Sequence, residues 1–267
     1  MQPVHFEDLR MMDYKTAWDY QEQLLRANVK AKTANGCQET PGVSREPSYL
    51  SSEIIGMSGE TNEYPTPYAS RLTPDDSRST THHLLFAEHP PVYTLGKSGK
   101  IENVLISDQD RQAKGIDFFY TNRGGDITFH GPQQIVGYPI LDLEKFYTDI
   151  GRYLRNLEEV MIQTMAEYGL QGQRSAGETG VWLDPGVKGM ERKIGAIGVR
   201  CSRWITMHGF AFNINTDLSY FDNIIPCGIQ HKKVTSLAAE LNHEVSFEEA
   251  KEKVKKNFEK VFDVKLV

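Results

Sequence analysis

The spacing of apolar residues predicts three amphipathic helices. Residues 14–25 repeat a core-type face every three or four positions, as a helix packed on one side requires. The strongest pattern runs from Asp149 to Tyr168 and is followed by Gly169, a residue type that commonly ends helices. A third helix is expected from Ser246, because Ser246 and Glu249 have capping-box spacing. The expected core faces are Tyr14, Trp18, Gln21 and Leu25; Ile150, Leu154, Leu157, Met161 and Met165; and Ala250, Val254, Phe258 and Val261.

Runs of β-branched and aromatic residues predict strands between these helices. The first run is interrupted by Pro90 and Pro91. Strands that outnumber the main helices, at hairpin-like spacing, indicate an α/β protein with a mixed, α+β-like sheet. The strands are expected within residues 84–96, 116–120, 134–143, 180–183, 193–200 and 204–215, and those at 116–120 and 134–143 are expected to be buried.

The segment between the first helix and Leu84 has a different composition. Residues 28–83 are rich in Ser, Thr, Gly and Pro, and Ile54 and Ile55 form their compact apolar element. Such a segment buries too little apolar surface to offset the entropy lost on ordering. We therefore expect a single domain over residues 1–267, with a polar, loop-like surface insertion within 28–83.

Composition and charge narrow the class of protein. The chain has 267 residues with 30 Lys+Arg against 36 Asp+Glu, a net charge of −6, and three cysteines. We expect no nucleic-acid partner, because binding phosphates needs clustered cations. No apolar run approaches the roughly 20 residues of a membrane helix, and the N-terminus has no basic and apolar signal pattern. Few, odd-numbered cysteines fit a reducing compartment, so we expect a cytoplasmic protein without a membrane partner.

The densest polar cluster is the segment from Arg123 to Pro132, RGGDITFHGP. Adjacent glycines let a backbone approach a ligand closely, and Arg123, Thr128 and His130 offer hydrogen-bond donors. The segment matches neither the phosphate-loop pattern nor G-x-G-x-x-G. From the residues alone it is either a ligand-binding loop or a β-hairpin with Gly-Gly-Asp at its tip.

Two further side chains could carry chemistry. Lys193 enters a run of small and apolar residues, where desolvation would make it a proton-transfer group; the alternative is a lysine at a strand end with its ammonium in water. Cys227 lies between Pro226 and Gly228 in a turn that leaves its sulfur little local cover, so it is either a nucleophile or a small buried residue. Neither Cys37 nor Cys201 lies in such a turn.

Other site types have weaker support. Residues 181–205 carry Lys188, Arg192, Lys193, Arg200 and Arg203 against two acidic residues, which is either a docking surface for an acidic partner or an ordinary solvated face. The histidines do not form H-E-x-x-H and no C-x-x-C occurs, so we expect no metal site. The G-x-S-x-G elbow of serine hydrolases is also absent.

Several motifs together resemble the lipoyl(octanoyl) transferase family, also called lipoate–protein ligase B. They cover about residues 84–245, together with the first helix. The motifs are EHPPVYTLG at 88–96, RGG-x-x-T-F-H-G-P at 123–132 followed by Gln134, Tyr138 and Pro139, K-I-x-x-x-G-V-R at 193–200, H-G-x-A-x-N at 208–213, D-L-x-x-F at 217–221, P-C-G at 226–228, and Thr235-Ser236.

The resemblance implies the biotin/lipoate ligase fold and transfer of an octanoyl group from octanoyl-acyl carrier protein to a lysine of a lipoyl domain. Acceptors would be the lipoyl domains of 2-oxoacid dehydrogenase E2 subunits and the glycine-cleavage H protein. Cys227 would carry the acyl group as a thioester, and Lys193 would lower its pKa and act as general acid/base. No cofactor would be needed. The implied acyl pocket comprises Arg123, Gly124, Gly125, Asp126, Ile127, Thr128, Phe129, His130, Ala196, Ile197, Gly198, Gly209, Phe210 and Ala211, and we expect the small residues, with Gly195, to make room for an aliphatic chain.

The chain departs from the family pattern at two places. The usual H-G-P-G-Q has Gln133 in place of its second glycine, and the 28–83 insertion has no implied role.

Two alternative functions remain open. One is an ATP-dependent lipoate or biotin ligase of the same fold, which would not need Cys227. The other is a non-catalytic protein that binds an acyl carrier or a lipoyl domain.

Overall fold

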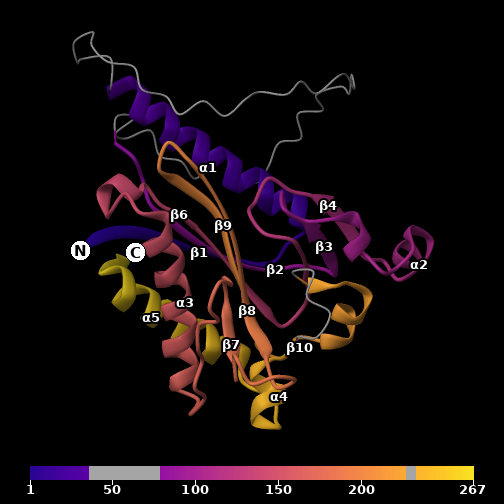
Figure 1. Cartoon of the computed structure of the whole chain (residues 1–267). Helices are drawn as coiled ribbons and strands as arrows, with labels where there is room; N and C mark the ends of the chain where they lie inside the picture. Colours follow the sequence, from indigo (N-terminus) through magenta and orange to yellow (C-terminus); the bar gives the residue numbers. More distant parts are fainter. Residues whose placement is uncertain (36–78, 227–232) are drawn as a thin grey trace.

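A twisted mixed sheet forms the centre of the molecule (Figure 1). The computed structural model describes residues 1–35, 79–226 and 233–267. The described strands follow the order β10-β8-β9-β6-β2-β1-β11, and β7 pairs with β8 at the side. Their bounds are β1 Gln2–Met11, β2 His83–Glu88, β6 Gln134–Ile140, β7 Val181–Leu183, β8 Arg192–Ser202, β9 Ile205–Asn213, β10 Lys233–Val234 and β11 Val264–Leu266.

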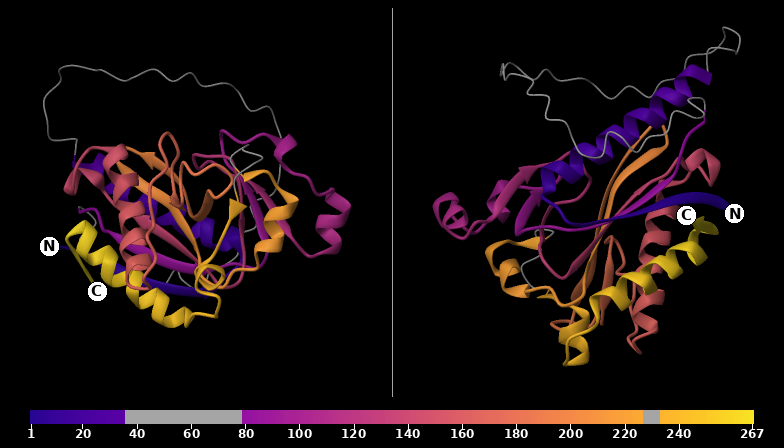
Figure 2. Two further views of the ribbon diagram at one scale, coloured as in Figure 1. Left: turned by 60° about the horizontal axis from the view of Figure 1, so that its bottom comes forward. Right: turned by 180° about the vertical axis from the view of Figure 1, so that it is seen from behind.

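Helices cover both faces of this sheet (Figures 1 and 2). Helix α1 (Tyr14–Asn35) packs on β6 and β9, and α3 (Ile150–Ala166) and α5 (Phe247–Phe262) pack together on the opposite face. The main core lies under α3 and α5, where Phe210 and Phe212 of β9 are buried. Shorter helices are α2 (Asp108–Ala113), α4 (Leu237–Leu241) and the 3₁₀ turns Ile101–Asn103, Leu143–Lys145 and Leu218–Asn223. Among the described residues, no helix combines the length and the apolar character that crossing a membrane requires.

A second sheet of three strands adjoins the first. Strand β3 (Val92–Leu95) lies in its centre, between β4 (Asp117–Tyr120) and β5 (Ile127–His130). The segment 123–126, here called the RGG loop, connects β4 to β5, and these strands each pair with β3 and not with one another. The hairpin interpretation of this segment is therefore wrong, because the loop crosses over the end of β3.

The structure confirms the predicted helices α3 and α5. Asp149 caps α3, and Gly169 follows the helix with a φ of +78°. Ser246 caps α5 by accepting a hydrogen bond from the Glu249 backbone N–H at 3.3 Å. The buried face of α3 includes Tyr153, whereas Leu154 is half-buried, so the true face is rotated slightly from the expected one.

Two expectations need correction, and two strands were not foreseen. Helix α1 continues through residues 28–35, so this part of the expected insertion is helical, and the strand after the insertion begins at His83. Strand β4 is not buried. Strands β1 and β11, which pair in parallel at the chain ends, were not expected. Residues 36–78, and with them Cys37, lie outside the described residues, so the single-domain organisation stays a prediction.

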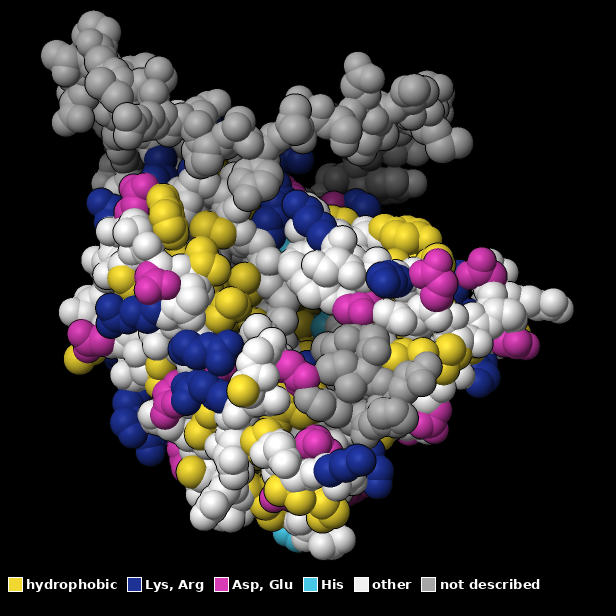
Figure 3. Space-filling view, in the orientation of Figure 1, with side chains coloured by type: hydrophobic (Ala, Val, Ile, Leu, Met, Phe, Trp, Pro, Cys, Tyr) yellow, Lys and Arg dark blue, Asp and Glu magenta, His cyan; other side chains and the backbone are white. Residues whose placement is uncertain are grey.

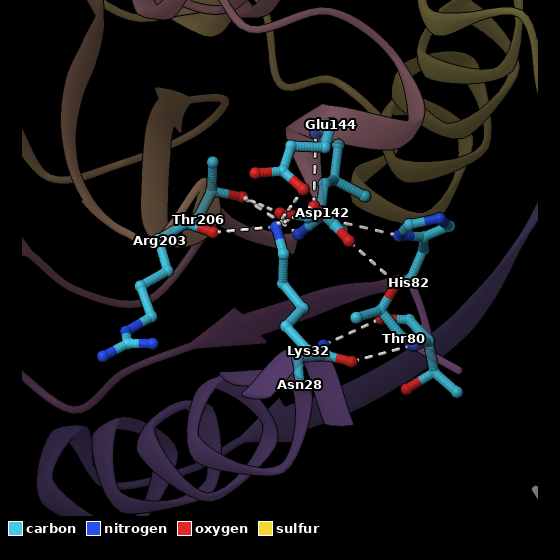
Figure 4. Close-up of polar contacts among 10 residues, drawn as sticks. Asn28, Lys32, Thr80, His82, Asp142, Glu144, Arg203 and Thr206 are labelled. Atoms are coloured by element: carbon cyan, nitrogen blue, oxygen red, sulfur yellow. Dashed lines mark hydrogen bonds and ion pairs between the residues drawn. The ribbon is translucent and has the colours of Figure 1, made fainter. Parts of the chain in front are cut away.

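A buried carboxylate joins the last turns of α1 to the start of β2 (Figure 4). Asp142 is 1% exposed at its side chain, pairs with Lys32 at 2.8 Å, and accepts a hydrogen bond from Thr80 Oγ1 at 2.9 Å. Asn28 exchanges two hydrogen bonds of 2.8 Å with the backbone of Thr81. These contacts attach α1 to the sheet at the end distant from Tyr14, which contributes to the site described next.

Candidate active site

A cavity of about 580 Å³ lies between strands β8, β9 and β6 and the RGG loop. In the space-filling view a hollow opens near the middle of the molecule, with a histidine side chain visible inside it (Figure 3). Most of the predicted site residues line this cavity: Lys193, Arg123, Gly125, Asp126, Ile127, Thr128, His130, Ala196, Ile197, Gly198, Gly209, Phe210 and Ala211.

Two predicted pocket residues lie elsewhere. Phe129 stacks on Tyr220 with ring centroids 4.5 Å apart, in the small core beneath the second sheet. Gly124 donates its backbone N–H to the Val199 carbonyl at 2.9 Å and so attaches the RGG loop to β8. Cys227 lies outside the described residues. Pro226, its neighbour in the chain, lines the cavity.

Lys193 is held inside the protein. Its residue is 9% exposed, its Nζ donates to the Thr179 carbonyl at 3.3 Å, and the same atom lies 4.6 Å from the centre of the Trp182 ring. In the sheet, β8 carries Lys193 between Trp182 of β7 and Val234 of β10. The ammonium therefore lies against the cavity wall, and the alternative of a strand-end lysine with its head in water does not hold.

The hydrogen bonds of the Arg123 side chain hold the RGG loop against strand β3. Its Nη2 donates to the Thr94 carbonyl at 2.6 Å and to Thr94 Oγ1 at 2.9 Å, and its Nη1 donates to the Gly124 carbonyl at 3.0 Å. A Cβ on Gly198 would lie 2.8 Å from the Gly124 carbonyl oxygen. Glycine at 198 therefore allows the loop to approach β8 closely.

We had expected the glycines to make room for an acyl chain, but two of them do not. A Cβ on Gly195 would meet the Met161 sulfur at 2.5 Å on the opposite face of the sheet, and one on Gly209 would meet the Gly137 carbonyl oxygen at 2.1 Å. These positions serve close packing of neighbouring groups. The small residues that leave room are Ala196 and Ala211, which pair across β8 and β9 and both line the cavity.

Burial keeps the cavity's imidazoles neutral. Desolvation lowers the pKa of His130 to about 3, with help from His89, and lowers the pKa of His208 to about 3, with help from Arg123. Desolvation also raises the pKa of Tyr14 to about 12. The cavity histidines and this phenol therefore carry no charge near neutral pH, which suits an apolar ligand.

Sequence reasoning missed part of the lining. Gln134, Val136 and Tyr138 follow one another at period two on β6, so strand alternation could have identified them as one face. Tyr14 lay on the predicted face of the first helix, but its approach to the cavity depends on tertiary packing. The other lining residues outside the prediction are Ser98, Gly177, Glu178, Thr179, Ile194, His208, Asn213, Phe221, Pro226 and Val234.

Gln133 adopts a backbone conformation that suits the glycine of the family pattern. Its φ is +62°, in the left-handed region. Its carbonyl accepts hydrogen bonds from the Asn215 N–H and the Thr216 hydroxyl, both at 3.1 Å, and these contacts hold the turn against the end of β9. Gln133 does not line the cavity, so this departure leaves the pocket surface itself unchanged.

The basic stretch at 181–205 is partly neutralised. Arg192 pairs with Asp184 at 2.5 Å and with Glu240 at 2.6 Å, and Arg200 pairs with Glu22. Lys188 and Arg203 are exposed. The surface available to an acidic partner is therefore smaller than the sequence indicated.

The remaining candidate groups offer little chemistry. Burial raises the pKa of the Cys201 thiol, which disfavours its thiolate. Over residues 1–35, 79–226 and 233–267, no three His, Cys, Asp or Glu side chains are grouped so that they could hold a metal ion.

Comparison with known proteins identifies the class. Residues 70–259 match the lipoyl protein ligase A/B catalytic domain, and the chain belongs to this family. Among solved structures, P. falciparum LipL1 in complex with lipoate has a TM-score of 0.61 at 11% identity, over 98% of this chain and 62% of that one. Lipoate-protein ligase A bound with ATP has a TM-score of 0.57 at 14% identity, over 70% of this chain and 75% of that one. At these identities the likeness shows the fold alone, and it confirms the predicted lipoate-ligase type of fold.

Curated relatives narrow the activity. An octanoyltransferase of Christiangramia forsetii is 50% identical over 264 residues, which are 98% of this chain and 97% of that protein. An octanoyltransferase of Flavobacterium psychrophilum is 49% identical over 265 residues, 99% of this chain and 98% of that protein. These matches confirm the predicted family and show that the chain is an enzyme, an octanoyltransferase.

Proposed function

We propose that this enzyme moves an octanoyl group from octanoyl-acyl carrier protein to a lysine of a lipoyl domain, by way of a thioester on Cys227. The observation that carries the proposal is the placement of Lys193: its buried ammonium lines the same cavity as Pro226, the residue joined to Cys227. A cation near a cysteine favours the thiolate, which is the nucleophilic form.

The first step exchanges one thioester for another. The Cys227 thiolate attacks the octanoyl carbonyl, a new C–S bond forms, and the bond to the carrier's thiol breaks. The Lys193 ammonium, which holds the proton lost by the Cys227 thiol, delivers that proton to the departing carrier thiolate. The exchange is nearly isoenergetic because one thioester replaces another.

The second step forms the amide. The acceptor lysine attacks the Cys227 thioester as a free amine, the C–N bond forms, and Cys227 leaves as a thiolate. Lys193, neutral after the first step, accepts the proton that the attacking nitrogen loses, which restores the pair of ammonium and thiolate. An amide is more stable than a thioester, so the transfer needs no ATP.

The acceptors in this proposal are lipoyl domains of 2-oxoacid dehydrogenase E2 subunits and the glycine-cleavage H protein. Support comes from the family match and from a solved Thermoplasma acidophilum relative, an archaeal lipoate protein ligase described with its E2 lipoyl domain, which has a TM-score of 0.56 at 16% identity and covers 70% of this chain.

A donor comparison tests the proposal against ATP-dependent ligation. We expect the enzyme to modify a lipoyl domain with octanoyl-acyl carrier protein in the absence of ATP, and to show no activity with octanoate and ATP. Cys227→Ser should abolish the carrier-dependent reaction, whereas Cys201→Ser should retain it. Activity with octanoate and ATP that survives Cys227→Ser would identify a ligase instead, and binding without modification would identify a non-catalytic protein.

A further inference from the structure

Four rings close one end of the cavity. Tyr14, His130 and Tyr138 line it, and His89 packs behind them. Each of these residues is 6% exposed or less, and we call the group the ring wall. Its members come from α1, from the loop after β2, from β5 and from β6.

Hydrogen bonds and ring contacts hold the wall in one arrangement. His89 Nδ1–H donates to the Met12 carbonyl at 2.7 Å, which leaves Nε2 of the neutral imidazole to accept the Tyr138 hydroxyl at 2.6 Å. Tyr14 stacks on His130, with centroids 5.9 Å apart and planes 10° from parallel. A wall with this many internal contacts resists displacement by a ligand, because packed interiors tolerate extra volume poorly.

The ring wall lies diagonally across the cavity from Lys193. The register places Ala196 of β8 beside Ala211 of β9, and Ala211 beside Val136 of β6. These three residues line the cavity and form an apolar floor that crosses three strands, a distance of roughly 10 Å. Lys193 lies beyond one corner of this floor, and Tyr138 lies beyond the opposite corner, two residues past Val136 along β6.

We propose that the ring wall sets the length of the acyl chain that the enzyme accepts. The inference rests on the proposed acyl thioester beside Lys193. From there an extended chain crosses the alanine–valine floor and meets the wall. With carbon–carbon bonds of about 1.5 Å, an octanoyl chain spans roughly 9 Å, close to the width of the floor across its three strands. The offset between Lys193 and Tyr138 along the strands comes in addition to this width. A longer chain would have to displace the packed rings, and a shorter one would leave part of the floor uncovered.

Enlarging the wall tests this proposal. The rate of acyl-enzyme formation is measured with hexanoyl, octanoyl, decanoyl and dodecanoyl thioesters of the carrier protein. The wild-type rate should be highest with octanoyl and fall with decanoyl. Tyr14→Ala should raise the ratio of decanoyl to octanoyl rates about tenfold or more, as removal of a pocket wall does for added methylenes. Tyr20→Ala removes a ring from the same helix outside the cavity lining and should leave the ratio unchanged.

Narrowing the floor tests it in the opposite direction and does not depend on the stability of Tyr14→Ala. Ala211→Val should raise the ratio of hexanoyl to octanoyl rates by a similar factor. If the chain-length profile stays the same in folded Tyr14→Ala and in Ala211→Val, the proposal that the ring wall sets the accepted chain length is wrong. Absence of an acyl-enzyme with every thioester in the wild type would instead overturn the proposed function.

Discussion

Replacing Lys193 by methionine is expected to slow octanoyl transfer between a hundred- and ten-thousandfold, the usual contribution of a positioned acid/base group. Methionine keeps an unbranched side chain of similar length, so contact with the Trp182 ring is retained while the ammonium is lost. The expected loss falls on kcat for transfer to the lipoyl domain, measured by the appearance of modified domain. The folded state should persist, because the substitution removes a buried cation and introduces an apolar group at the same place.

Lys188→Met is the matched control for this change. Lys188 lies in the loop before β8 and is exposed, so its loss removes an equal charge near the site without touching the cavity. The control should keep nearly all of the wild-type rate. Equal rates for Lys193→Met and wild type would remove Lys193 from the mechanism.

Acid is expected to unfold the protein well above the pH at which carboxylates alone would do so. Desolvation lowers the pKa of His83 and His89 to about 4, and of His130 and His208 to about 3. In the unfolded chain, each of these four imidazoles binds a proton as the pH falls through about 6.5. In the folded chain, they stay neutral down to about pH 4. Stability is therefore unaffected above about pH 7 and lost steadily below pH 6.5.

The size of this effect is large. Each proton bound by the unfolded state alone lowers the free energy of unfolding by about 1.4 kcal/mol per pH unit, so four protons give about 5 kcal/mol per unit near pH 5. A typical domain has only about 5–15 kcal/mol to lose. Urea unfolding at a series of pH values between 8 and 5 measures the slope.

Substitution of single histidines shows how much each one contributes to the slope of the free energy of unfolding against pH. His83 is buried at the start of β2, outside the cavity lining, and His83→Gln should reduce the slope by about one proton. The same substitution at exposed His243 should leave the slope unchanged. A free energy of unfolding that stays constant from pH 7 to pH 5 would mean that the buried imidazoles accept protons without unfolding.

The sequence predicted elements whose signal is local. Strands β6, β8 and β9 and helices α3 and α5 carry their period within a few residues, and the structure confirms them. Strands β1 and β11 have no such signal, because β1 is mostly polar and gains its partner from the other end of the chain, with Gln2 beside Val264. The last turns of α1 also escaped prediction, since their polar residues are held by Asp142 and Thr81 and not by an apolar stripe.

The candidate site likewise combines features that have a local sequence signal with features that depend on tertiary packing. Lys193 and the RGG loop could be found from motifs, but the loop's geometry could not: Gly-Gly-Asp indicates a turn whether the flanking strands pair together or lie on either side of β3. The small-residue argument failed at Gly195 and Gly209, since a sequence does not tell which neighbour fills the space beside a glycine. The ring wall escaped notice because its four residues come from four elements, and only tertiary packing brings them together.

Intact mass measurement of the enzyme after mixing with octanoyl-acyl carrier protein, without an acceptor, tests the central claim most directly. The account predicts a mass increase of one octanoyl group that hydroxylamine removes. The adduct should be absent from Cys227→Ala and present in Cys201→Ala and Cys37→Ala. No adduct on the wild type, or an adduct that persists in Cys227→Ala, would contradict the thioester mechanism.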